Sequence, residues 1–147
     1  MELNNRILII NGPNLNLLGI REPEVYGNQT FEQYFNLLKA KFTSYNLDYY
    51  QTNHEGNIID KLHLIGFSYF GIILNAGAFT HYSYAISDAI AAINSPVVEV
   101  HISNIYERED FRKVSVTKMN CIDMIYGKGL KGYELALEKL ISFNQNN

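Results

Sequence analysis

The segment Arg6-Ile7-Leu8-Ile9-Ile10, followed at once by Asn11-Gly12-Pro13-Asn14-Leu15-Asn16, indicates the class of fold to expect. Its first half is short and apolar, which is typical of a strand buried on both faces of a parallel sheet. Its second half places amides and a proline where such a strand would leave the core. Together the two halves predict a parallel α/β sheet with a polar site at one edge.

Four more apolar runs follow along the chain, and segments with helical periodicity separate them. The five expected strands are Arg6–Ile10, Leu47–Thr52, Gly71–Leu74, Val97–Ile102 and Cys121–Tyr126. Apolar strands that alternate with helices form a parallel sheet with helices on both faces. We therefore expect one α/β domain over residues 1–147, a flavodoxin-like, doubly wound sheet of five parallel strands.

The helical segments carry their own start and stop signals. Thr30 and Gln33 form a capping box that opens the first helix. The apolar face of this helix consists of Phe31, Tyr34, Phe35, Leu38, Phe42 and Tyr45. The later helices are expected at Ile58–Ile65, at Tyr84–Ile93 with Thr80 as its cap, and from Gly132 through Ile141, with a frayed tail at Asn144–Asn147.

The composition fits an ordinary globular domain. The chain has 147 residues, of which 47% are hydrophobic and 18% charged, and its formal net charge is −3. This length can bury a full core, and the lack of a basic tract argues against a nucleic-acid partner. No apolar stretch reaches membrane-spanning length and Met1–Asn5 lacks a signal-peptide core, so we expect a cytoplasmic protein that does not bind membranes.

Neither a metal nor a cofactor is expected. Cys121 is the single cysteine and lies in an apolar run, so a buried, inert thiol is expected instead of a disulfide or a cysteine-rich zinc site. Residues 127–132 match G-x-G-x-x-G but follow the last strand, so we interpret them as the turn into the last helix. The histidines, which are His54, His63, His81 and His101, lack the spacing of metal ligands.

Polar residues follow four of the expected strands, at the end where ligands bind in doubly wound sheets. These segments are Asn11–Asn16, Asn53–Gly56, Asn75–Ala78 and His101–Asn104. Each segment alone is most simply explained as a turn or a cap. Their repetition at one edge of the sheet favours a ligand crevice.

Glu99 and His101 are candidates for acid–base chemistry. They lie two residues apart in an expected strand, so their side chains point to the same face. A carboxylate in that position can orient and charge the imidazole. A histidine at a strand end is often only a satisfied polar group, but its neighbour and its place at the crevice favour a general acid or base.

Tyr26 and Arg21 lie on one loop that glycines bound at both ends. The ordinary pKa of a tyrosine is about 10, so Tyr26 is a useful base only if a cation stabilises its phenolate. Arg21 is one such cation, and Arg108 and Arg112 can approach from the segment after the fourth strand. Spacing alone leaves open whether Tyr26 is a base or an aromatic residue that pins the loop. The bounding glycines also suggest a lid.

Asn75, His81 and Asp88 lie around the start of the third helix. Backbone amides at a helix start can receive an anion such as a substrate carboxylate. His81 can equally be an ordinary first-turn residue, and Asp88 is expected at the surface or at an interface.

The chain resembles the type II 3-dehydroquinate dehydratases, or type II dehydroquinases, from its first strand to its last helix. The matching segments are NGPNLNLLGIREPEVYG (11–27), QTNHEG (51–56), NAGAFTHYSYAISDAI (75–90), VEVHISNIYERE (98–109) with Phe111-Arg112 after it, and GKGLKGY (127–133). The resemblance implies a subunit that dehydrates 3-dehydroquinate to 3-dehydroshikimate by anti elimination through an enolate. It implies no metal, cofactor or lysine Schiff base, and it fits both aromatic biosynthesis through the shikimate pathway and quinate breakdown.

The resemblance also implies roles for individual residues. Tyr26 matches the base, Arg21 the residue that favours its phenolate, and Asn14 the position that holds a water against the enolate oxygen. His101 matches the general acid, with Glu99 behind it. The implied substrate-binding positions are Asn75, His81, Asp88, Ile102, Ser103 and Arg112, with Ile102 and Ser103 offering backbone amides to the substrate carboxylate. Family members form trimers, usually four to a dodecamer, in which Asp88 reaches a neighbour's site.

The departures from the family pattern spare these positions. Asn57 stands where an acidic residue is common, and residues 117–119 lack the usual serine-proline pair.

Three other classes of protein use the same scaffold. An FMN carrier would need a hydroxyl-rich loop after the first strand, a phospho-receiver an aspartate in place of Asn75, and an inactive binding protein would not need Tyr26, Arg21 and His101.

Overall fold

The computed structural model describes residues 4–146, except for the side chains of Val25 and Tyr26. Five parallel strands form one sheet in the order β2-β1-β3-β4-β5. Their bounds are β1 Arg6–Asn11, β2 Asn46–Gln51, β3 Gly71–Asn75, β4 Val97–His101 and β5 Asp123–Tyr126. This is the strand order of flavodoxin-like sheets, so the expected fold class is confirmed.

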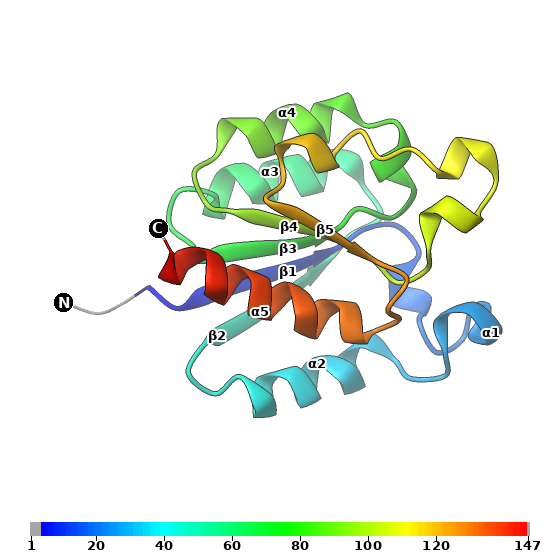
Figure 1. Ribbon diagram of the computed structural model, residues 1–147, viewed down its shortest axis with the longest axis horizontal. Coiled ribbons are helices and arrows are strands. Elements are labelled where there is room, and N and C mark those ends of the chain that lie inside the picture. The colour runs from blue at the N-terminus through cyan, green and yellow to red at the C-terminus, as the bar shows by residue number, and fades with distance from the viewer. Residues whose placement is uncertain (1–3, 147) are drawn as a thin grey trace.

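Helices cover both faces of the sheet (Figure 1). Their bounds are α1 Pro23–Tyr26, α2 Phe31–Lys41, α3 Glu55–Ile65, α4 Tyr84–Ala92 and α5 Lys131–Gln145. Helices α2 and α5 pack on one face, and α3 and α4 pack on the other. The short helix α1 lies apart from both layers. Within residues 4–146 no helix is long and apolar enough to span a membrane.

Strand β1 shows why the central strands are apolar at every position. Ile7 and Ile9 point into the core under α2 and α5, whereas Leu8 and Ile10 point into the core under α3 and α4. Successive side chains of a strand alternate between its faces, so a strand covered on both sides needs both sets. Burying each of these side chains contributes about 1.5–3 kcal/mol relative to leaving it exposed.

Helix α2 has the predicted cap, whereas α4 starts at Tyr84 as predicted but with a different cap residue. At α2, the Thr30 hydroxyl accepts from the Gln33 amide at 3.2 Å and the Gln33 side chain accepts from the Thr30 amide at 3.0 Å. At α4, the cap is Ser83, whose hydroxyl accepts from the Ile86 amide at 3.0 Å, so the prediction of Thr80 as the cap was wrong. Thr80 is fully buried one turn earlier, in the 3-10 turn η2 (Gly77–His81).

The last strand begins later than predicted. The backbone N–H of Cys121 donates to the Lys118 carbonyl at 3.0 Å and closes the turn η5 (Lys118–Asn120), so β5 starts only at Asp123. Cys121 is half-buried rather than buried. Burial nevertheless raises the pKa of its thiol, and the nearby charge of Glu99 adds to this, which fits an inert residue.

Residues 127–130 form the turn from β5 into α5, as expected for a glycine-rich segment in this position. The prediction of a frayed tail from Asn144 was wrong, because α5 continues through Gln145. The Asn144 side chain donates to the Leu140 carbonyl at 2.8 Å within the helix. Asn147 lies outside the described residues.

Gly12 lets the loop after β1 pass close to the loop after β3. Its N–H donates to the Asn75 carbonyl at 2.7 Å, and a Cβ at this position would lie 2.6 Å from the Ala76 carbonyl oxygen. Only glycine allows this approach without a backbone shift. The two loops therefore leave the sheet side by side and carry their polar residues to one place.

Candidate active site

A cavity of about 140 Å³ lies beyond the carboxyl ends of β1, β3 and β4. The predicted site residues that line it are Asn14, Arg21, Asn75, His81, His101, Ile102, Ser103 and Arg112. These come from four separate segments of the chain, so the predicted crevice and most of its predicted residues coincide.

The segment after β2 does not line the cavity, contrary to the prediction for Asn53–Gly56. Strand β2 lies at the edge of the sheet, and its loop supports the cavity wall from behind. The Asn53 side chain accepts from the backbone N–H of Asn14 at 3.0 Å and from the Gln51 side chain at 3.1 Å. Asn14 has a positive φ of 69°, an uncommon conformation for a residue other than glycine, and this contact helps to hold it.

Two predicted residues, Glu99 and Asp88, are absent from the lining. Glu99 is fully buried and lies behind His101, the position that the resemblance implies. Asp88 is exposed on α4, which agrees with a surface position. The side chain of Tyr26 lies outside the described residues, although its backbone ends α1. Arg108, which spacing placed only near Tyr26, lines the cavity and donates to the Ser103 hydroxyl at 3.2 Å.

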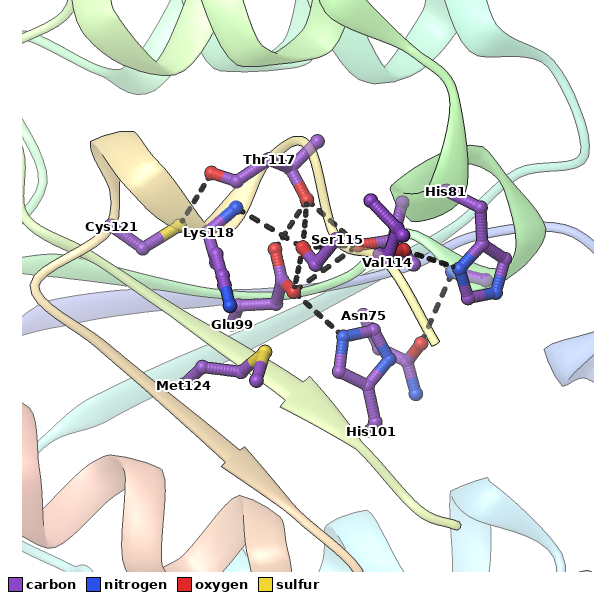
Figure 2. A network of polar contacts seen from close by, with 12 residues as sticks. Asn75, His81, Glu99, His101, Val114, Ser115, Thr117, Lys118, Cys121 and Met124 are labelled. Atoms are coloured by element: carbon purple, nitrogen blue, oxygen red, sulfur yellow. Dashed lines mark hydrogen bonds and ion pairs between the residues drawn. The ribbon is translucent and has the colours of Figure 1, made fainter. Parts of the chain in front are cut away.

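Glu99 and His101 form a buried pair on β4 (Figure 2). The ring Nε2 of His101 lies 2.7 Å from Glu99 Oε2, and the two residues are 6% and 0% exposed. The predicted contact along one face of the strand is therefore confirmed. Because Nε2 donates to the carboxylate, Nδ1 is the ring nitrogen left for the cavity.

Three hydroxyl groups complete the surroundings of Glu99. Ser115 and Thr80 donate to Glu99 Oε2 at 2.6 and 3.1 Å, and Thr117 donates to Oε1. Burial acts to raise the pKa of Glu99, but the contacts with His101, Ser115 and Thr117 outweigh it and hold the pKa below its usual value. Sequence reasoning missed these residues, although Ser115-Val116-Thr117 has the spacing that puts two hydroxyls on one side of an extended segment.

Asn75 is held by a buried polar chain that leads across the sheet. Its Nδ2 donates to the Tyr133 hydroxyl at 3.0 Å, and that hydroxyl donates to Asn11 Oδ1 at 2.7 Å. Its Oδ1 accepts from the Gly77 N–H at 3.1 Å. Tyr133 is fully buried, which raises the pKa of its phenol and keeps it a neutral donor. The amide of Asn75 therefore has one fixed orientation at the cavity wall.

His81 is oriented by the backbone of the segment that carries Arg112. Its Nδ1 donates to the Val114 carbonyl at 2.7 Å, which leaves Nε2 as an acceptor. Desolvation lowers the pKa of His81, and the charges of His101 and Arg112 lower it further. The lowered pKa favours the neutral imidazole, whose Nε2 can accept a hydrogen bond from a ligand hydroxyl.

The cavity is rich in cations. Arg21, Arg108 and Arg112 all line it, and Arg112 lies in the turn η4 (Asp110–Arg112) with its Nε 2.7 Å from Glu109 Oε2. Arginine groups bind carboxylates through charge-assisted hydrogen bonds. The arrangement can therefore bind a small anionic molecule beside an imidazole–carboxylate pair. No group of three or more metal-ligating side chains occurs in the described part of the chain.

Known proteins resemble this chain over most of its length. The model of the family "Dehydroquinase class II" matches residues 5–141. The 3-dehydroquinate dehydratase of Caldicellulosiruptor saccharolyticus is 52% identical and covers 92% of this chain and 95% of its own. The 3-dehydroquinate dehydratase of Bacillus cytotoxicus is 54% identical and covers 92% of this chain and 94% of its own.

Solved structures agree with the sequence relatives. The type II dehydroquinase of Butyrivibrio crossotus superposes with a TM-score of 0.90 and 49% identity, covering 94% of this chain and 98% of that one. The type II dehydroquinase of Propionibacterium acnes superposes with a TM-score of 0.87 and 36% identity, covering 97% and 99%. The similarity includes the fold and the segments that form the cavity.

Proposed function

The chain belongs to the class II dehydroquinase family, and we propose that the residues around its cavity carry out the 3-dehydroquinate dehydratase reaction by the roles given below. The enzyme is a hydro-lyase that acts on the small molecule 3-dehydroquinate and belongs to the shikimate pathway. A flavodoxin-like FMN carrier or binding protein is not supported by these relatives.

The reaction needs three kinds of group. The proton next to a ketone is weakly acidic, so a base must remove it and a donor must stabilise the enolate that results. Hydroxide is a poor leaving group, so an acid must protonate it as the carbon–oxygen bond breaks. The products are then 3-dehydroshikimate and water, formed by anti elimination.

His101 is the acid in this proposal, and the observation that carries it is the buried pair with Glu99 at 2.7 Å. Nδ1 of the imidazolium gives its proton to the departing hydroxyl. Glu99 accepts from Nε2 throughout, so the ring cannot turn and its positive charge is compensated. A surface histidine without such a partner would have neither a fixed ring orientation nor a compensated positive charge.

Tyr26 is the base, and Arg21 stabilises its phenolate. Arg21 lines the cavity from the segment between Gly19, with a φ of 91°, and Gly27, with a φ of 84°, a loop that includes the short helix α1. Glycine tolerates these conformations, so the loop can turn tightly at both ends. We propose that it closes over the substrate as a lid and brings the phenol to the carbon that loses its proton.

The remaining residues bind the substrate and its enolate. Arg112 and the backbone amides of Ile102 and Ser103 receive the carboxylate, and the carbonyls of Ile102 and Ser103 are held by the N–H groups of Gly129 and Gly127, both at 3.1 Å. Asn75 and His81 contact the substrate hydroxyls. Asn14 holds the water that donates to the enolate oxygen.

Assembly and location are part of the same proposal. The chain forms one domain, and its copies form trimers and then a dodecamer. Asp88 is exposed on α4 and so is free to reach the site of a neighbouring subunit. The enzyme works in the cytoplasm and takes no cofactor.

The absorbance of the product tests the proposed function. 3-Dehydroshikimate is a conjugated enone, so purified protein mixed with 3-dehydroquinate should raise the near-ultraviolet absorbance without added metal. The rate should survive treatment with a chelator and with borohydride, because neither a metal nor a Schiff base takes part. A preparation that is folded and shows no absorbance change, or that loses its rate to borohydride, contradicts the proposal.

A further inference from the structure

Glu99 is a carboxylate without access to solvent. It is 0% exposed, and its two oxygens accept from four groups: His101, Thr80, Ser115 and Thr117. An ionised carboxylate that loses its water needs such donors, since an unsolvated charge is strongly disfavoured in a protein interior.

The three hydroxyls form a compact group from two different segments. Thr80 comes from η2, and Ser115 and Thr117 come from the segment after η4. Their oxygens lie 3.0 Å (Thr80 to Ser115), 2.8 Å (Thr80 to Thr117) and 3.3 Å (Ser115 to Thr117) apart. All three residues are buried. We call these three residues the hydroxyl clamp.

We propose that the hydroxyl clamp keeps Glu99 ionised and aimed at His101, and thereby sets how well His101 donates its proton to the leaving hydroxyl. The clamp residues touch neither substrate nor the reacting atoms, so they are positioning residues. The inference rests on the role of His101 proposed above.

The chemistry of the surroundings supports this assignment. The titratable groups that face Glu99 are His101 from β4, His81 from η2 and the Cys121 thiol from the segment before β5. Of these, only His101 contacts the carboxylate, and a protonated Glu99 would leave its imidazolium without a counter-charge. Serine and threonine cannot ionise near neutral pH, so the clamp supplies donors and adds no charge of its own.

The clamp also joins two segments that other contacts hold together. The same two segments are joined by a hydrogen bond from the Val116 N–H to the Thr80 carbonyl at 2.8 Å and by the contact between His81 and Val114. The clamp could then serve only to tie the loops together. A test must therefore read the charge of Glu99 and the proton transfer separately from stability.

The test variants remove one hydroxyl and keep the packing. Thr117→Val has nearly the same shape as wild type, Thr117→Ser restores the hydroxyl, and Ser115→Ala and Thr80→Val serve if one variant does not fold. Ser95→Ala is the matched control, because Ser95 is buried and donates to the Tyr69 carbonyl at 2.7 Å away from the cavity. Thermal unfolding checks that each variant is folded.

The first measurement is the titration of the Glu99 carboxyl by 13C NMR in protein labelled at its glutamates, with Glu99→Gln identifying the signal. Removing one donor to a charge should move the midpoint upward by about one to two pH units. Thr117→Ser and Ser95→Ala should titrate as wild type does. An unchanged midpoint in both Thr117→Val and Ser115→Ala overturns the proposal.

The second measurement compares two rates on 3-dehydroquinate in deuterium oxide: exchange of the proton next to the ketone, and dehydration. A weaker acid lets the enolate return to substrate more often, so the ratio of exchange to dehydration should rise about tenfold or more in Thr117→Val. Loosened loops would lower both rates and leave the ratio unchanged, which would overturn the proposal.

His101→Gln separates this inference from the function on which it rests. Wild-type dehydration by His101→Gln contradicts the role of His101 itself. If His101→Gln is impaired in dehydration but the clamp variants keep the wild-type ratio of exchange to dehydration, only the proposed role of the hydroxyl clamp is contradicted.

Discussion

The Glu99–His101 pair sits on a buried central strand, whereas Arg21 reaches the same cavity from a largely exposed loop. The pair is 0% and 6% exposed and is held by hydroxyls from two segments. On the loop, Ile20 is 76% exposed, and Glu22 adopts a positive φ of 42°. In the proposed mechanism, the acid side of the site is thus built into the core before substrate arrives, and the base side depends on the position of a loop.

This difference has a mechanistic consequence. A preformed imidazole–carboxylate pair has its orientation fixed in advance, so it needs no reorganisation during the reaction. A base on a loop can admit substrate and then complete the site. Changes on the two sides should therefore affect different steps of the reaction.

Replacing Tyr26 by phenylalanine should have the largest effect. The loss of the base should lower kcat about 10²- to 10⁴-fold, because general base catalysis is worth about that much. Steady-state kinetics by product absorbance measures this, and circular dichroism should show an unchanged fold. Turnover within a few-fold of wild type would show that Tyr26 is not the general base.

Replacing Glu99 by glutamine should reveal how the core side depends on pH. The folded pKa of Glu99 is lowered, so the stability that its ionisation contributes is present above the ordinary glutamate pKa and is lost as pH falls towards the folded value. The free energy of unfolding of wild type should therefore decrease more steeply with acidification than that of Glu99→Gln. Urea unfolding between neutral and acid pH measures the two slopes, and equal slopes contradict an ionised Glu99.

Replacing Tyr133 by phenylalanine should destabilise the fold by about 1–3 kcal/mol, because Asn75 and Asn11 each lose a buried partner. Asn75 loses its fixed orientation, so KM for 3-dehydroquinate should rise more than kcat falls. Chemical unfolding and steady-state kinetics measure the two effects. A stable variant with unchanged KM would show that the polar chain does not orient Asn75.

The glycines of the loop should give the smallest effects, and they form a matched pair. Both need a positive φ, but a Cβ at Gly19 would lie 2.9 Å from the Asn28 carbonyl oxygen, whereas a Cβ at Gly27 would meet nothing within 4 Å. Gly27→Ala should cost about 1 kcal/mol of stability from backbone strain, and Gly19→Ala should cost more and lower kcat/KM further, because its Cβ also meets the Asn28 backbone. Equal effects of the two substitutions would show that the positive φ alone, and not the contact with Asn28, decides the outcome.

The core side could largely be predicted from sequence, because its signals are local. An apolar run with amides after it predicts the end of a buried strand, and two-residue spacing predicts the contact of Glu99 with His101. The capping box of Thr30 and Gln33 likewise lies within four consecutive residues of the sequence.

The remaining features depend on contacts between distant segments. Thr80 and Ser115 meet at Glu99 only because η2 and the segment after η4 pack together, and no periodic pattern reports such a meeting. Thr80 resembles a helix cap in sequence, yet Ser83 is the cap in the structure. Asn53 follows a strand at the edge of the sheet. The order of the strands decides which strand lies at the edge, and the local sequence does not reveal that order.

Proton exchange in His101→Gln tests the division between the two sides most directly. We predict that this variant in deuterium oxide still exchanges the proton next to the ketone of 3-dehydroquinate, because Tyr26 is intact, while dehydration falls by at least about 10²-fold. Tyr26→Phe should lose both. Dehydration at the wild-type rate in His101→Gln, or loss of exchange together with dehydration, would contradict the account.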